Sequence, residues 1–498
     1  MTRPDPRLFK GFRDVFADDL VVKQWMIERV RGVYERYGYI PLETPALEFV
    51  DCLGKNLPEQ DTPEGGIFAF RNPDLAQDES GPDSWLALRY DLTAPLARLC
   101  AQYANLSRPF RRYQIGPVWR YEKPGIGRFR EFTQFDFDAV GVSGPAADAE
   151  VACIMCDALQ ALDFEPGDFV IRVNNRKVLL GVLASAGIDD GDLGDPRSKP
   201  GTVLRAIDKL DRLGLPGVVE LLGPGREDET GDFTEGAHLD DAQIERVRAF
   251  LSIADRDRAS VCAQLASLVG DSPVGRAGID ELTGINGVLD ALGYESDRII
   301  FDPTVVRGLG YYTGPVFEGV LTKEIRDAKG RVRTFGSVYG GGRYDGLIER
   351  FTGERVPATG ASVGLDRLLE AIKLIRGTSR TATADVLIVN FDDSMLTRYM
   401  TLAQSFRDAD IATEVYLGKG NMKKQLKYAD RLGVPFAVII GSEEFERGTA
   451  QVKNLWLGAK LSAEMDSREK WAKQPAQEEV PIDGLVAYVR DALARQTR

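Results

Sequence analysis

The stretch from Trp119 to Asp138 carries side chains that are well suited to chemistry in this chain of 498 residues. The two-residue repeat of a β-strand separates its side chains onto two faces. One face carries Arg130, Phe132, Gln134, Asp136 and Asp138, and the other carries Phe129, Phe135 and Phe137. Arg120 and Glu122 share a face of a preceding strand, and a Pro/Gly loop joins the two strands. The pattern predicts either a polar site on a rigid platform or an amphipathic hairpin with a solvated face.

The elements around this hairpin suggest three parts of the chain. Residues 18–37 repeat apolar side chains at helical spacing, and strand-rich blocks lie on either side of a mostly helical stretch, 176–296. Beyond a polar linker, strands at 386–389, 412–417 and 436–440 alternate with helices, which predicts a largely parallel sheet. We therefore expect a catalytic domain of residues 1–175 and 297–375, a helical insertion domain of residues 176–296, and an α/β domain of residues 384–498.

Composition limits the class of protein. With 43% hydrophobic and 28% charged residues, the chain is typical of globular proteins, and its length favours two or three domains. No apolar run approaches the roughly 20 residues that span a bilayer, and no signal-like segment opens the chain, so we expect a cytoplasmic protein without a membrane partner. The net charge of −13 argues against a broadly basic surface, although a local basic patch could still bind RNA.

Two residue types that often bind metals or catalyse reactions have structural interpretations here. Cys153 and Cys156 lie in an apolar helical pattern with no second pair or nearby histidine, which favours a core helix over a zinc site. The single histidine, His238, lies in an acidic stretch of the predicted insertion, so we expect it at the surface.

Several stretches together resemble one enzyme family. The Trp119–Asp138 hairpin resembles motif 2 of class II aminoacyl-tRNA synthetases, and Gly360–Arg367 resembles motif 3. The glycine- and tyrosine-rich run Val306–Glu318, which alone would be typical of a tight strand pair, is similar to a motif peculiar to histidyl-tRNA synthetases. The resemblance implies an α+β catalytic domain on an antiparallel sheet with a helical insertion, a C-terminal α/β anticodon-binding domain, and a homodimer.

The resemblance also implies substrates and roles. ATP and L-histidine would form histidyl-adenylate, with Mg²⁺ on the phosphates, and tRNA(His) would accept the histidine. Because two anions must meet, preorganised cations are the main catalytic need; by resemblance these are Arg120 and Arg307. The implied ATP-binding residues are Arg120, Glu122, Arg128, Phe132 and Arg367. The implied histidine-binding residues are Asp91, Leu92, Thr93, Arg120, Gln134, Asp138, Arg307, Tyr311, Tyr312 and Tyr344. The metal ligands stay unknown, and Gly310 replaces an aspartate that most members carry.

In the segment from Leu88 to Thr93, the residue pattern also has a purely structural interpretation. Asp91 and Thr93 share a face while Leu92 points away, as expected where a strand enters a helix that Thr93 caps at Ala94. This interpretation is compatible with a binding role for the same residues.

The C-terminal domain has one candidate RNA-binding helix. Lys423, Lys427 and Arg431 fall on one helical stripe, and Met422, Leu426 and Ala429 fall on another. A solvated helix face explains the cationic stripe as well as phosphate contact does, and the acidic balance of the whole chain favours phosphate contact modestly.

Two other functions compete with the synthetase. A non-catalytic paralogue could act as a histidine-sensing regulator, but such a chain should lose phosphate-binding arginines or the C-terminal domain. A pure RNA-binding scaffold would not need a histidine pocket. Histidine-dependent pyrophosphate exchange separates the three.

Overall fold

The computed structural model describes residues 3–53, 66–76, 81–125, 128–188, 198–228, 231–306, 312–376, 383–456 and 477–496. Two compact units are present: Met1–Asp14 with Lys23–Ile375, and Val15–Val22 with Arg376–Arg498. The predicted site residues Arg307 and Tyr311, and also Gly310, lie outside the described residues. Among the residues that the structure describes, no helix is both long and apolar enough to cross a membrane.

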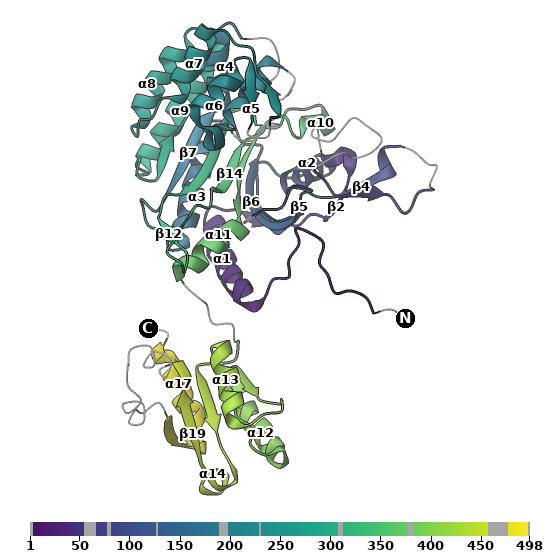
Figure 1. Cartoon of the computed structure of the whole chain (residues 1–498), viewed down its shortest axis with the longest axis vertical. Coiled ribbons are helices and arrows are strands. Elements are labelled where there is room, and N and C mark those ends of the chain that lie inside the picture. The colour runs from purple at the N-terminus through teal and green to yellow at the C-terminus, as the bar shows by residue number, and fades with distance from the viewer. Residues whose placement is uncertain are drawn as a thin grey trace. The chain divides into compact units, whose positions relative to one another are not determined.

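An eight-stranded sheet forms the centre of the first unit (Figure 1). Its order is β1 (Ile40–Pro41), β5 (Phe110–Trp119), β6 (Glu131–Val140), β15 (Ala358–Gly364), β14 (Ser337–Arg343), β11 (Pro315–Leu321), β7 (Phe169–Asn175) and β10 (Ile299–Phe301). Neighbouring strands are antiparallel except at the two edges, where β1 with β5 and β10 with β7 are parallel. The predicted antiparallel sheet is confirmed.

The two faces of β6 have different surroundings, as its alternating sequence predicts. Phe135 and Phe137 are fully buried, and their rings lie 4.9 and 4.7 Å from the ring of Tyr34 in helix α1 (Ala17–Arg36). Burying these rings is favourable by a few kcal/mol in total, at roughly 1.5–3 kcal/mol for each large apolar side chain. This apolar anchoring turns Gln134, Asp136 and Asp138 to the opposite face.

Helix α3 (Pro145–Ala161) packs against β7 and β15. Cys153 and Cys156 are buried within it, so the prediction of a core helix is confirmed. Helix α2 (Thr93–Gln102) follows a small sheet of β2 (Leu47–Phe49), β4 (Trp85–Leu88) and β3 (Ala69–Arg71), and helix α11 (Leu365–Arg376) follows β15 directly. Short elements complete this part of the unit: β12 (Ile325–Arg326), β13 (Val332–Arg333) and α10 (Glu349–Thr352).

The stretch predicted as an insertion is mainly helical. It contains α4 (Arg176–Ser185), α5 (Lys199–Ile207), α6 (Leu210–Leu222), α7 (Asp241–Leu251), α8 (Arg258–Val269) and α9 (Pro273–Ala291), which gather beyond β7 in Figure 1. A small pair of strands, β8 (Gly225–Glu227) with β9 (Phe233–Glu235), interrupts the helices of this stretch, which the sequence analysis did not predict. Helix α9 packs against α3 as well as α4 and α8, and the whole stretch belongs to the first compact unit.

The second unit is an α/β domain with a mixed sheet in the order β17 (Thr413–Val415), β16 (Val386–Ile388), β18 (Phe436–Ile439), β19 (Thr449–Asn454) and β20 (Gln477–Pro481). The three predicted strands are parallel, but β19 and β20 add antiparallel neighbours that the sequence analysis missed. Among the described residues of this unit, the α-helices after the linker are α12 (Leu396–Arg407), α13 (Met422–Leu432), α14 (Ser442–Arg447) and α17 (Ile482–Gln496).

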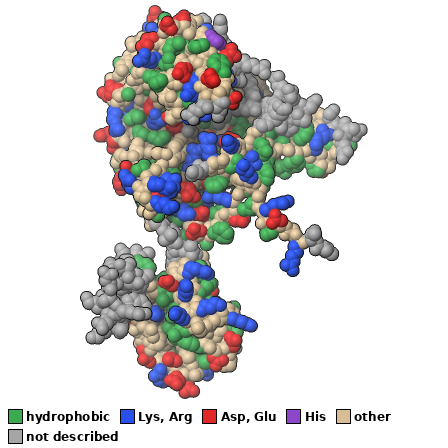
Figure 2. Space-filling model, viewed as in Figure 1, with side chains coloured by type: hydrophobic (Ala, Val, Ile, Leu, Met, Phe, Trp, Pro, Cys, Tyr) green, Lys and Arg blue, Asp and Glu red, His purple; other side chains and the backbone are tan. Residues whose placement is uncertain are grey.

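Helix α13 exposes its predicted cationic stripe. Lys423, Lys427 and Arg431 are all exposed, while Ala429 is buried. The buried face includes Gln425 rather than Met422, because Gln425 exchanges hydrogen bonds with the backbone of Asn390. Figure 2 shows Lys and Arg side chains gathered on this unit toward the end that carries α13, and Asp and Glu side chains toward the end that carries α14.

Candidate active site

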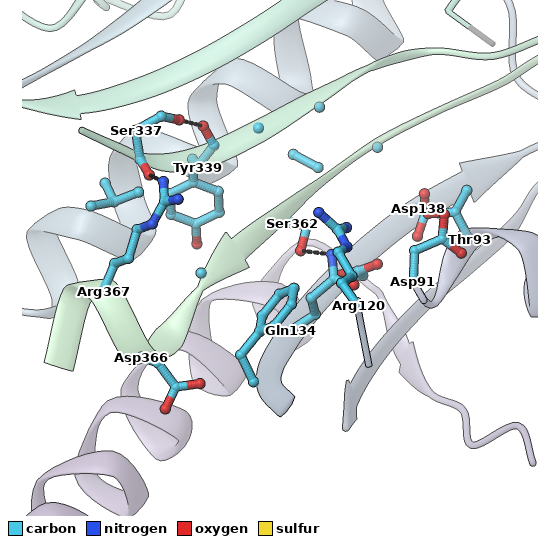
Figure 3. A pocket seen from close by; sticks show the side chains of 18 of the residues that line it. Asp91, Thr93, Arg120, Gln134, Asp138, Ser337, Tyr339, Ser362, Asp366 and Arg367 are labelled. Carbon is cyan, nitrogen blue, oxygen red and sulfur yellow. Dashed lines mark hydrogen bonds between the residues drawn. The ribbon is translucent and has the colours of Figure 1, made fainter. Parts of the chain in front are cut away.

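A cavity of about 440 Å³ opens on the polar face of the large sheet. This volume lies in the range of small-molecule sites. All of the predicted ATP-binding residues line it: Arg120, Glu122, Arg128, Phe132 and Arg367. So do the predicted histidine-binding residues Asp91, Thr93, Gln134, Asp138, Tyr312 and Tyr344. In Figure 3, Asp91, Thr93 and Asp138 lie at one end of this group, Arg367 and Asp366 lie at the other, and Arg120 and Gln134 lie between them.

The hairpin that brings Arg120 to the cavity is less regular than its sequence suggests. Strand β5 ends at Trp119 and β6 begins at Glu131, so Arg120 and Glu122 lie beyond the paired strands. The Nε of Arg120 donates to the carbonyl of Tyr90 at 3.0 Å, and its guanidinium lies 5.1 Å from the ring centre of Phe132. The half-buried guanidinium is therefore held between a backbone acceptor and an aromatic face.

The two-residue repeat fails just before β6. Phe129, assigned by that repeat to the face opposite Phe132, also lines the cavity. Arg130 points elsewhere, because it donates to the carbonyls of Glu122 and Lys10 at 3.1 and 3.2 Å. Both residues precede the strand, so strand periodicity does not govern them.

Asp91 has a structural role as well as a place in the cavity. Its Oδ1 accepts from the backbone N–H of Ala94 at 2.9 Å, so Asp91, one residue before the N-cap Leu92, satisfies an N–H of the first turn of α2; Thr93 is the first helical residue and not its cap. Burial raises the pKa of Asp91. Leu92 does not line the cavity: its side chain is fully buried, and its carbonyl accepts from Nη2 of Arg112 at 3.0 Å.

Two buried carboxylates, Asp136 and Asp138, lie on the cavity face of β6, 2% and 3% exposed. Burial raises the pKa of Asp136 to about 7 and also raises the pKa of Asp138. The phenol of Tyr344 donates to Oδ1 of Asp138, and Nη2 of Arg112 lies 2.7 Å from its Oδ2. The sequence analysis did not find Arg112, whose only signal is its register opposite Asp138 on the neighbouring strand β5.

Glycine is required where β15 passes Asp138. A Cβ on Gly360 would lie 2.3 Å from Oδ1 of Asp138, so only glycine leaves room for that carboxylate. On the adjacent strand, a Cβ on Gly341 would lie 2.3 Å from the carbonyl of Gly360. The glycines of β14 and β15 therefore let these two strands lie close together along the wall of the cavity.

The other end of the cavity is formed by β14 and the start of α11. Nη1 of Arg367 donates to the carbonyl of Ser337 at 2.9 Å (Figure 3). Asp366, which the sequence analysis missed, accepts from Nη2 of Arg13 at 2.8 Å and from the backbone N–H of Thr133 at 2.7 Å. Further lining residues to which the sequence analysis gave no role are Val338, Tyr339, Ala361 and Ser362; Ala361 and Ser362 lie within the stretch that resembles motif 3.

Among the described residues, no three His, Cys, Asp or Glu side chains gather to hold a metal ion. A magnesium ion that binds mainly through phosphate oxygens and water does not require such a group. His238 does not line the cavity; its side chain is 60% exposed beside Glu235, as expected for a surface residue.

Comparisons with known proteins agree with this geometry. A family model for histidyl-tRNA synthetase matches residues 11–368, and one for an anticodon-binding domain matches residues 385–492. The chain belongs to the histidyl-tRNA synthetase family. It is 49% identical to the histidine–tRNA ligase of Dinoroseobacter shibae and 51% identical to that of Cereibacter sphaeroides, over 99% of this chain and 98% of each relative. The crystal structure of histidyl-tRNA synthetase from Nostoc sp. PCC 7120 superposes with a TM-score of 0.73 at 28% identity, covering 98% of this chain and all of that chain.

Proposed function

We propose that this chain activates L-histidine with ATP and transfers the histidyl group to the terminal adenosine of tRNA(His). One observation carries the proposal: a single cavity joins a buried acidic end to a cationic, aromatic end. The acidic end suits an α-ammonium and an imidazole, and the cationic end suits a nucleoside triphosphate.

In the first step, the histidine carboxylate attacks the α-phosphorus of ATP and pyrophosphate leaves. Arg120 would stabilise the charge on the α-phosphate and Arg128 would bind the γ-phosphate, which are the preorganised cations that this step needs. Phe132 would stack on adenine with Arg367 on the opposite side, and Glu122 would accept from the adenine amino group. Arg307, assigned by resemblance, would act at the α-phosphate. A magnesium ion bound to the phosphates would neutralise part of their charge.

Histidine would bind at the acidic end. Asp91 and Thr93 would hold its α-ammonium with help from Gln134. Asp138 would accept an N–H of the imidazole, inside a wall formed by Tyr312 and Tyr344 and, by resemblance, Tyr311. Because the substrate carboxylate is already ionised, the step needs no general base from the enzyme.

The remaining parts of the proposal concern the assembly. We assign tRNA contacts to Lys423, Lys427 and Arg431 of α13, catalysis to residues 1–175 and 297–375, an insertion domain to residues 176–296, and anticodon binding to residues 384–498. We also propose that the protein is a homodimer and that it acts in the cytoplasm.

Histidine-dependent exchange of pyrophosphate into ATP tests the first step, and charging of tRNA(His) tests the second. We expect both activities from the purified chain. Histidine binding without exchange would favour the rival function, a histidine-sensing regulator. Against that rival, the phosphate-binding candidates Arg120, Arg128 and Arg367 all line the cavity.

A further inference from the structure

Arg112 is a fully buried charged side chain close to the cavity that the mechanism above does not use. It lies in the middle of β5, directly opposite Asp138 of β6. Its Nη2 lies 2.7 Å from Oδ2 of Asp138 and 3.0 Å from the carbonyl of Leu92, so it links Asp138 to the segment that carries Asp91 and Thr93. Arg112 does not itself line the cavity.

Asp138 therefore accepts a hydrogen bond from Tyr344 on Oδ1, while its Oδ2 is held in an ion pair with Nη2 of Arg112 that does not have hydrogen-bond geometry. A carboxylate oxygen has two lone-pair sites, so Oδ1, which accepts from Tyr344, keeps acceptor capacity for a ligand. With Arg112 in place, this end of the pocket offers the ligand an acceptor. A protonated Asp138 would offer a donor instead, which suits a different side chain.

We propose that Arg112 is a positioning residue that keeps Asp138 a hydrogen-bond acceptor, and thereby sets the preference of the site for a side chain that donates an N–H. The inference rests on the proposed function, because it concerns the same histidine pocket. It adds a specificity-determining residue that never touches the substrate.

The electrostatics support this role. Burial raises the pKa of Asp138, and Arg112 followed by Tyr344 oppose that rise. Asp136 lies two residues away on the same face, and its pKa is about 7, so the two carboxylates compete for ionisation. Arg112 lowers the pKa of both carboxylates, but its ion pair is with Asp138, so its loss should act on Asp138 most directly. Without Arg112, burial would act on Asp138 with only Tyr344 opposing it.

Few other groups near Asp138 could change their charge near neutral pH and so produce the same pH dependence. The titratable groups that influence Asp138 or Arg112 from neighbouring elements are Asp91, Tyr34, Tyr39, Tyr344 and Cys100. The tyrosines and the cysteine have pKa values raised well above neutrality by burial, that of Cys100 to about 11. The raised pKa values of the carboxylates therefore make these groups, and not the phenols or the thiol, the ones whose ionisation responds to pH closest to neutrality.

The test measures the Kd for L-histidine by calorimetry at several pH values for the full chain and for Arg112→Met. At each pH, the Kd of the variant is divided by the Kd of the unsubstituted chain. This ratio cancels the effect that protonation of free histidine has on both values. We expect a ratio of about 100 at pH 6.5 that falls below about 10 at pH 8.5, as Asp138 of the variant ionises. The Kd for ATP should change less than about threefold, since Arg112 lies outside the cationic end.

Arg258→Met is the matched control, because Arg258 is also a buried arginine, 4% exposed, with an ion pair to Asp290 and a hydrogen bond to the carbonyl of Ile299. It lies in α8, away from the cavity lining, so histidine binding should be unchanged. If Arg112→Met does not fold, Arg112→Lys carries the test. Lysine keeps the positive charge but not the guanidinium contacts with Asp138 and the carbonyl of Leu92. We therefore expect a Kd ratio of about 10 at pH 6.5, which again falls as the pH rises.

The outcomes separate the claims. A ratio near 1 for Arg112→Met, or a large ratio that does not change with pH, overturns the inference and leaves the proposed function standing. Absence of histidine binding by the unchanged chain overturns the proposed function, and the inference with it. A ratio that falls with pH while Arg258→Met binds normally supports the inference.

Discussion

At the scale of single residues, Asp91 combines a role in the fold with a proposed role in binding. It is 5% exposed, it lines the cavity, and it caps α2 through the backbone N–H of Ala94. Asp91→Asn keeps an oxygen for this cap but removes the charge. We therefore expect a KM for histidine raised by about 10-fold or more, with little change in Tm.

Asp91→Ala separates the two roles further, because it removes the cap as well as the charge. It should match Asp91→Asn in its KM for histidine but lose about 1 kcal/mol more of stability. Pyrophosphate exchange and thermal melts measure the two effects. An unchanged KM for histidine in both variants would show that Asp91 acts only as a cap.

At the scale of elements, the sequence predicted what local periodicity determines. The alternation of β6 correctly turned Gln134 and Asp138 to the site, because Phe135 and Phe137 need burial. It failed at Phe129, where the strand has not yet begun, and it could not find Arg112, whose place depends on the register of another strand. Asp366 lies within the stretch that resembles motif 3, but its role was missed because its partner Arg13 is distant in the sequence.

The N-terminal segment, residues 8–13, supports the hairpin from outside the cavity. The carbonyl of Gly11 accepts from the backbone N–H of Arg130 at 2.9 Å, and Arg13 lies 4.0 Å from the ring centre of Phe129 while pairing with Asp366. Phe129 and Asp366 both line the cavity. This segment thus links the hairpin to the start of α11, at the end proposed for ATP.

Gly11→Ala should therefore weaken the binding of ATP more than the binding of histidine. The φ of Gly11 is +91°, and an added Cβ would lie 2.8 Å from Cγ of Arg130 and 2.9 Å from Cγ of Pro124. We expect a KM for ATP raised by about 10-fold, since a loss of about 1.4 kcal/mol of binding corresponds to that factor.

Gly330→Ala provides the control, because Gly330 has a φ of +74° but open space around its Cβ. It introduces comparable backbone strain without a clash near the hairpin, so both KM values should stay near those of the unchanged chain. Steady-state exchange at varied ATP and histidine measures the split. Equal effects of Gly11→Ala on the two substrates would contradict a specific role at the ATP end.

At the scale of the whole molecule, the proposed chemistry and the proposed tRNA contacts fall in different units. The residues that line the described cavity come from the first unit. The second unit has its own core on both faces of its sheet, because Val386 and Ile388 of β16 belong to one apolar cluster and Leu387 to another. Changes on its surface should therefore leave the first reaction step intact.

The stripe of α13 allows this separation to be tested. Replacing Lys423, Lys427 and Arg431 by glutamine removes three exposed positive charges. If they contact phosphates, the KM for tRNA(His) should rise by about 10-fold or more, and the slope of log affinity against log salt should become shallower by up to about 0.7–0.9 for each lost contact. Histidine-dependent pyrophosphate exchange without tRNA should not change.

A control variant removes the same number of charges from other elements of this unit: Arg447→Gln on α14 with Arg490→Gln and Arg495→Gln on α17, all three exposed. A general effect of net charge would weaken tRNA binding equally in both variants, since long-range attraction depends on total charge as well as on contacts. Direct contact by α13 predicts a loss confined to the first variant. Equal tRNA affinity in the α13 variant and the unchanged chain would instead leave the stripe as a solvated helix face.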